Sequence, residues 1–163
     1  MPRSRRPWRL FGPRENAWRP SPRPPVILND TYNASPEATR MALETLAMFD
    51  TSYFTIALLG DMLELGEETA AYHEEIGAAC AKNNLGLLGL TGAYRDSTRK
   101  GAIRHGFDKG KIFFFDDEDS LLKNLAPHLN KSAMILVKGS RALRMERWIE
   151  VILSKTGKRG GKA

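Results

Sequence analysis

The chain has 163 residues, a length typical of one domain, and its 42% hydrophobic content excludes a disordered polar chain. The single cysteine, Cys80, excludes an intrachain disulfide and suits a reducing compartment. No run of about 18 apolar residues occurs, so the sequence predicts no membrane-spanning helix. These features together favour a cytoplasmic globular domain.

The formal net charge of +6 belongs to the two ends of the chain. Residues 1–25 contain seven arginines, one glutamate and seven of the nine prolines, whereas residues 26–154 contain 14 basic and 18 acidic residues. The sequence therefore predicts an irregular Arg/Pro-rich segment at 1–25, a folded domain at 26–154 and a basic flexible tail at 155–163. Nucleic-acid binding through the basic ends is a minor alternative, because such tails attract phosphate without specificity.

Strands and helices alternate from Val26 onward. Ser35 and Pro36 are typical of a helix N-cap followed by proline at the first helical position, and Met41, Leu43 (or Ala42), Leu46 and Phe49 form an apolar stripe on that helix. Strands are predicted at 26–29, 54–59, 85–90, 111–115 and 133–137. Helices are predicted at 36–49, 67–83, 93–105, 117–125 and 140–153. This order predicts a doubly wound α/β fold with a mostly parallel sheet of five to six strands and helices on both faces.

Ligands of doubly wound folds bind beyond the carboxyl ends of the strands, and three of these ends are rich in polar residues. They are residues 29–36, 59–67 and 138–146. In the third, Gly139 permits a tight turn and Ser140 is expected to cap the next helix, so that its free N–H groups, with Lys138 and Arg141, form an anion site. The alternative is an ordinary turn with solvated basic side chains.

The other two strand ends leave two interpretations open. Asp30 and Asn33 are suited to hydrogen-bonding a sugar or a base, or to shaping the turn that leads to Ser35. Asp61 is suited to orienting an ammonium group, or to capping its own loop.

Four segments carry a family resemblance: DTYNASP at 30–36, LGDMLELGE at 59–67, YHEEIG at 72–77 and KGSRALRME at 138–146. In order and spacing they resemble the signatures of the Rossmann-like C-terminal domain of the MurF family, the UDP-N-acetylmuramoyl-tripeptide:D-alanyl-D-alanine ligases of the Mur ligase superfamily. The resemblance covers roughly residues 26–154. DTYNASP departs mildly from the commoner DSYNANP form.

The resemblance implies amide-bond formation in peptidoglycan synthesis, with ATP and Mg²⁺ as cofactors and D-Ala-D-Ala and UDP-MurNAc-tripeptide as substrates. It implies that Asp30, Tyr32 and Asn33 contact the ribose and adenine of ATP. It also implies that the segment from Lys138 to Arg141, including Gly139 and Ser140, holds the dipeptide carboxylate with Asp61 nearby. Lys138 and Arg141 are the expected catalytic groups, because their cations offset charge at the reacting centre.

The sequence contains no G-x-x-x-x-G-K-[ST] loop, the phosphate cradle of the family's central domain. We therefore expect that the chain alone has no ligase activity and binds neither ATP nor Mg²⁺ tightly. We also expect it to be a monomer. Either a separate central ATP-binding domain completes the enzyme, or the chain is a truncated ligase. A stand-alone dipeptide- or nucleotide-binding module is the main alternative.

Several conspicuous residues are expected to have structural roles. His73 fits a structural histidine better than a catalytic one, and Cys80 and Trp148 fit the core. The acids at 116–119 fit a solvated helix start, and no metal site is predicted.

Overall fold

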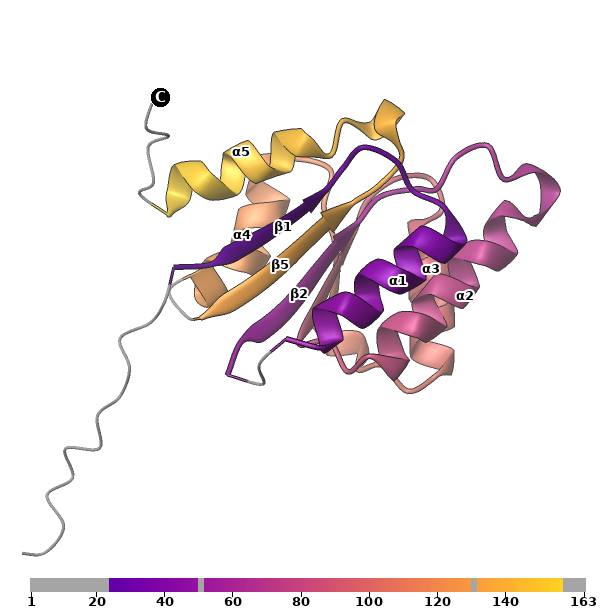
Figure 1. Cartoon of the computed structure of the whole chain (residues 1–163), viewed down its shortest axis with the longest axis horizontal. Coiled ribbons are helices and arrows are strands. Elements are labelled where there is room, and N and C mark those ends of the chain that lie inside the picture. The colour runs from indigo at the N-terminus through magenta and orange to yellow at the C-terminus, as the bar shows by residue number, and fades with distance from the viewer. Residues whose placement is uncertain (1–23, 50–51, 130–131, 157–163) are drawn as a thin grey trace, which may run out of the picture.

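The computed structural model describes residues 24–49, 52–129 and 132–156. Five strands form the sheet: β1 (Val26–Asp30), β2 (Phe54–Leu59), β3 (Leu87–Leu90), β4 (Ile112–Phe114) and β5 (Ala133–Lys138). The α-helices are α1 (Pro36–Ala47), α2 (Thr69–Lys82), α3 (Arg95–Arg104), α4 (Glu118–Leu129) and α5 (Glu146–Lys155). Three short 3₁₀ turns, at Gly66–Glu68, Lys109–Lys111 and Arg141–Leu143, lie between them (Figure 1).

All paired strands are parallel, in the spatial order β1-β5-β2-β3-β4. The predicted doubly wound α/β fold is therefore confirmed, with five strands in the described part of the chain. β5, the last strand in sequence, lies between the first two. This arrangement places the carboxyl ends of β1, β5 and β2 side by side.

Helices cover both faces of the sheet, and each face has its own core (Figure 1). On one face α1, α2 and α3 pack through side chains such as Leu43, Ile76 and Ala102. On the other face α4 and α5 pack through Leu121 and Ile152. Successive residues of β2 and β5 alternate between the two cores, which explains why these strands are apolar at almost every position.

Helix α1 begins as predicted but buries fewer apolar residues than its stripe indicated. The Ser35 hydroxyl accepts a hydrogen bond from the Ala38 N–H at 3.2 Å, and Pro36 opens the helix. Leu43 and Leu46 are fully buried, whereas Met41 is 60% exposed. The prediction that Met41 contacts the core is wrong, because it lies beside the free edge of β1, where no further strand of the described chain extends the sheet.

The largest boundary error concerns the final helix, which was predicted at 140–153. The Arg141–Leu143 turn comes first, and Arg144 then adopts the left-handed conformation at φ 49°. A residue in that conformation interrupts a right-handed helix, so α5 starts only at Glu146. The predicted helix at 67–83 is likewise a 3₁₀ turn followed by α2.

The predicted segments at 1–25 and 155–163 fall almost entirely outside the described residues. β1 starts at Val26, where the first strand was predicted to begin. No described helix combines the length and the apolar character needed to cross a membrane.

Candidate functional site

Three polar strand ends meet at one edge of the sheet, as the sequence predicted. In the strand register Lys138 is paired with Asp30 of β1 on one side and with Leu59 of β2 on the other. Asp61 follows Leu59 by two residues. The segments that carry Asp30, Asp61 and Lys138 are therefore direct neighbours in space.

Lys138 is held inside the protein. The residue is only 2% exposed, and its Nζ donates to Asp30 Oδ2 and to the Asn33 carbonyl oxygen, each at 2.8 Å. A buried ammonium is tolerated when such partners replace water. The contacts fasten the loop after β1 to the end of β5.

Asp61 is also engaged by the protein. It is 4% exposed, and its two carboxylate oxygens accept from the backbone N–H groups of Ala93 and Tyr94, at 2.7 and 3.0 Å. These N–H groups lie immediately before α3, where the helix dipole favours a negative charge. The structure therefore supports the capping interpretation of Asp61, although it caps the loop after β3 and not its own loop.

The loop after β3 is part of the site, and sequence reasoning missed it. Gly92 has φ +103°, and a Cβ placed there would lie 2.5 Å from the carboxylate oxygens of Asp61. Gly92 thus lets the chain turn tightly around this carboxylate. A glycine two residues after the end of a buried strand was the available signal.

His73 forms hydrogen bonds that hold the loop after β2, which contains Asp61. Its Nε2 lies 3.1 Å from the Met62 nitrogen, which must donate to it, and its Nδ1 lies 2.8 Å from the Thr69 carbonyl oxygen. These partners require a neutral ring with the proton on Nδ1. Although Nε2 is 3.8 Å from Asp61 Oδ1, this is not an ion pair, because Nε2 is already an acceptor. The prediction of a structural histidine agrees with this geometry.

The prediction that Ser140 caps the next helix is wrong, because Ser140 precedes the Arg141–Leu143 3₁₀ turn and its side chain makes no capping hydrogen bond there. Its N–H donates to the Asp61 carbonyl oxygen at 2.9 Å, and its hydroxyl accepts from the Leu63 N–H at 2.8 Å. Gly139 is needed because a Cβ there would lie 2.7 Å from Met145 Cγ. The α-helix expected to start beside Lys138 starts only at Glu146, and Gly139 and Ser140 connect β5 to the loop after β2.

The remaining predicted residues face outward. Tyr32 is 79% exposed, Asn33 and Arg141 are exposed, and the Asp30 side chain is 46% exposed. The Asn33 Oδ1 accepts from the Ala34 N–H at 2.8 Å, which shapes the turn towards Ser35. The edge thus has an inner set of braces, namely Asp61, Lys138 and Ser140, and an outer set of accessible groups, namely Tyr32, Asn33 and Arg141.

The two carboxylates at this edge are engaged by groups of the protein. Asp30 is paired with Lys138 and Asp61 with two N–H groups, so neither carboxylate is free as an Mg²⁺ ligand. Within the described residues no group of three or more His, Cys, Asp or Glu side chains is placed to hold a metal. The exposed Tyr32 ring and the Asn33 amide are suited to the face and polar edge of a base.

The chain is a doubly wound α/β domain with polar loops at the carboxyl ends of its parallel strands, the place where such domains commonly bind ligands. Comparison with known proteins identifies its family. A family model described as "Mur ligase, glutamate ligase domain" matches residues 17–141, and the chain belongs to this family. Within it, the domain is of the MurF C-terminal type.

The relatives support this assignment but are much longer proteins. UDP-N-acetylmuramoyl-tripeptide--D-alanyl-D-alanine ligase of Bacillus subtilis is 28% identical over 127 residues, which is 78% of this chain and 28% of that protein. The Haemophilus influenzae ligase of the same name is 33% identical, covering 74% of this chain and 26% of its own length. The chain thus spans just over a quarter of the relatives it matches.

Solved structures give the same result. MurF ligase from Thermotoga maritima in complex with ADP superposes with a TM-score of 0.68 at 32% identity, over 83% of this chain and 30% of that one. MurF from Acinetobacter baumannii gives a TM-score of 0.70 at 26% identity, over 80% of this chain and 28% of that one.

Proposed function

We propose that this domain supplies one wall of the nucleotide and dipeptide site of a cytoplasmic, ATP-dependent ligase that joins D-Ala-D-Ala to UDP-MurNAc-tripeptide. The observation that carries the proposal is the braced edge, where Tyr32, Asn33 and Arg141 are exposed around a buried Lys138. Accessible groups on a rigid base are what substrate positioning requires.

Each exposed group has a defined task in this proposal. Tyr32 and Asn33 contact the adenine and ribose of ATP, and Asp30, half exposed, completes that contact. Arg141 binds a carboxylate of the dipeptide through its planar, forked guanidinium, which can donate two parallel hydrogen bonds. ATP, when bound, supplies the phosphoryl group that activates the tripeptide carboxylate.

Lys138, Gly139, Ser140 and Asp61 act as positioning residues in this proposal. Lys138 stays within the protein and holds Asn33 through its carbonyl oxygen, at 2.8 Å. Ser140 and Asp61 hold the loop after β5 against those after β2 and β3. The positive charge of Lys138 also lies close to the edge, where it offsets the negative charge of bound phosphate and carboxylate groups.

The phosphate cradle must come from another polypeptide segment, because the sequence of this chain contains no P-loop. We therefore expect no ADP release by the chain alone with ATP, D-Ala-D-Ala and UDP-MurNAc-tripeptide. Phosphoryl transfer depends on that cradle and its metal ion for charge stabilisation.

A chimera tests the proposal directly. Residues 26–156 replace the C-terminal domain of the Thermotoga maritima MurF ligase, and ADP release is measured with all three substrates. We expect an active chimera whose rate falls about 100-fold with Arg141→Ala, as for other lost charged donors. Lys123→Ala, on the exposed surface of α4, is the matched control and should leave the rate unchanged. A folded chimera that binds nucleotide but is inactive would contradict the proposal.

A further inference from the structure

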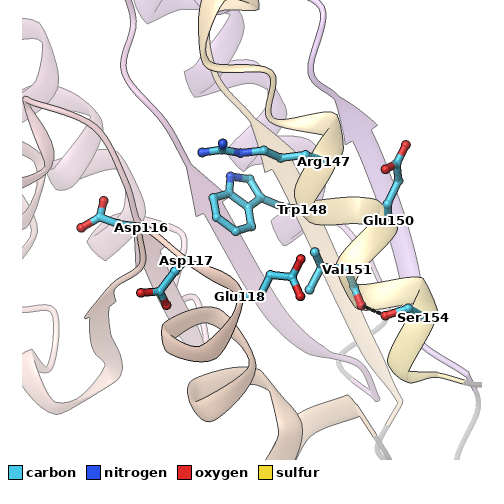
Figure 2. A pocket seen from close by; sticks show the side chains of 8 residues that line it. All are labelled: Asp116, Asp117, Glu118, Arg147, Trp148, Glu150, Val151 and Ser154. Atoms are coloured by element: carbon cyan, nitrogen blue, oxygen red, sulfur yellow. Dashed lines mark hydrogen bonds between the residues drawn. The ribbon is translucent and has the colours of Figure 1, made fainter.

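A cavity lies on the face of the sheet that α4 and α5 cover, between the start of α4 and α5. It has a volume of about 500 Å³, within the range of small-molecule sites. The residues that line it include Glu118 at the start of α4 and Arg147, Trp148 and Val151 on α5 (Figure 2). None of these residues belongs to the edge that carries Tyr32 and Arg141.

The most informative residue of this cavity is Trp148. It is only 3% exposed, and the centres of its ring and the Phe115 ring lie 5.1 Å apart in an edge-on arrangement. Among the described residues its indole N–H has no hydrogen-bond acceptor. Buried indole N–H groups in proteins usually have an acceptor. A ligand oxygen that enters the cavity beside this donor would supply the acceptor that the described residues do not.

Arg147 places a second donor on the same side. Its guanidinium carbon lies 4.4 Å above the centre of the Trp148 ring, and it makes no ion pair within the described residues. Since Arg147 is an exposed side chain, it can shift and give a ligand access to the indole N–H without any change of the backbone. Arginine and an indole N–H together favour a carboxylate oxygen.

The opposite end of the cavity is acidic. Figure 2 shows the Glu118 carboxylate below the indole and Arg147 above it. Glu118 has no ion pair within the described residues. In contrast, Asp116 is paired with Arg95, and Asp117 accepts from the Ser120 N–H at 2.7 Å. Glu150 also lines the cavity and has no ion pair within the described residues, but Figure 2 shows its side chain directed away from Trp148. Glu118 is therefore the unpaired acid on the side of the indole.

We propose that this cavity binds a small zwitterion, an amino acid or a short peptide. Its carboxylate meets Arg147 and the Trp148 indole N–H, and its ammonium group meets Glu118. A simple anion is disfavoured by the surrounding acids, and a simple cation leaves the indole N–H without an acceptor. The proposal does not depend on the function of the strand edge.

The indole N–H provides the readout. The full chain has three tryptophans, so the double variant Trp8→Phe/Trp18→Phe leaves a single indole signal in a ¹H–¹⁵N spectrum. Glycine, diglycine and triglycine are titrated as zwitterions with different charge separations. We expect at least one of them to move the Trp148 indole signal with saturation below about 10 mM.

Blocked peptides and single substitutions test the ammonium contact and the carboxylate contact independently. Blocking the ammonium, as in N-acetyl-diglycine, or the carboxylate, as in diglycinamide, should weaken binding about tenfold, and so should Glu118→Gln or Arg147→Gln. Asp119→Asn changes an exposed acid in the same turn of α4 and should have no effect. The proposal is overturned if no zwitterion gives a saturable shift, or if the blocked peptides bind as well as diglycine.

Discussion

Lys138 and Asp30 form an ion pair across β5 and β1 in which the two partners have very different environments. The Nζ–Oδ2 distance is 2.8 Å, and the side chain of Lys138 is 2% exposed whereas that of Asp30 is 46% exposed. Water can therefore replace Lys138 as a partner of Asp30, but it cannot replace Asp30 as a partner of Lys138.

This asymmetry predicts unequal costs for the two single substitutions. Asp30→Ala leaves the buried Lys138 ammonium with the Asn33 carbonyl oxygen as its hydrogen-bond acceptor, and we expect the free energy of unfolding to fall by about 2–4 kcal/mol. Lys138→Met leaves a carboxylate that water can reach, and we expect a loss of about 1–2 kcal/mol. Urea denaturation followed by circular dichroism measures both, and an equal or larger loss for Lys138→Met would contradict the assignment.

Asp61→Asn tests the brace between β2 and the loop after β3. The amide keeps one acceptor and turns an NH₂ group towards a backbone N–H, so we expect a loss of about 2 kcal/mol in the free energy of unfolding. Asp96→Asn, in the exposed first turn of α3, is the control and should cost less than about 0.5 kcal/mol. Similar losses for the two variants would show that the hydrogen bonds of Asp61 contribute little.

The contact between α2 and α3 depends on glycine. A Cβ at Gly101 would overlap the backbone of Glu74 on α2, which cannot move aside as a side chain could. We expect Gly101→Ala to lower the melting temperature, at a cost of about 2–3 kcal/mol. In Gly110→Ala the nearest atom is a side-chain oxygen of Asp108 at 3.3 Å, so this variant should be nearly neutral.

Burial raises the pKa of the Cys80 thiol to about 12, from an ordinary value of 9.0. The folded state thus holds this proton more tightly than the unfolded state does. Cys80 therefore favours folding below about pH 9, and this contribution declines as the pH rises towards 12. We expect the free energy of unfolding of the wild type to fall more steeply with pH than that of Cys80→Ala across this range. Parallel pH profiles for the two proteins would refute the expectation.

Accessibility of the same thiol gives a simpler measurement. In the native protein at pH 8 we expect Cys80 to react with a disulfide reagent only as fast as the chain opens, because the thiol is fully buried. In concentrated urea the reaction should finish within seconds. Fast labelling of native protein would place Cys80 at the surface and contradict the core assignment.

The fold was predictable because its signals are local. Continuous apolar runs such as 54–59 indicate strands covered on both faces, and Ser35-Pro36 marks the start of α1. The meeting of three polar strand ends followed from the parallel sheet alone. Trp148 and Cys80 were correctly placed in the core because each lies on the apolar side of its helix.

The function of individual site residues was harder to predict, because it depends on contacts between distant segments. Nothing in the sequence of residues 138–141 indicates that the Lys138 ammonium donates to Asp30. Nor does it indicate that the Ser140 hydroxyl accepts from the N–H of Leu63, 77 residues earlier. The left-handed conformation of Arg144 could not be predicted either, because arginine rarely adopts it. It explains why the helix does not continue through this residue and α5 begins later. Met41 looked like a core residue because periodicity cannot show where a sheet ends.

The hydrogen bonds of Asp61 have a consequence for ligand affinity. Its main-chain and side-chain oxygens join the loops after β2, β3 and β5, while Lys138 joins the loop after β1, so four segments form one preorganised surface. A ligand that docks there immobilises only the outer side chains, among them Tyr32 and Arg141. The protein would therefore lose little conformational entropy when a ligand binds, so fewer contacts would be needed for a given affinity.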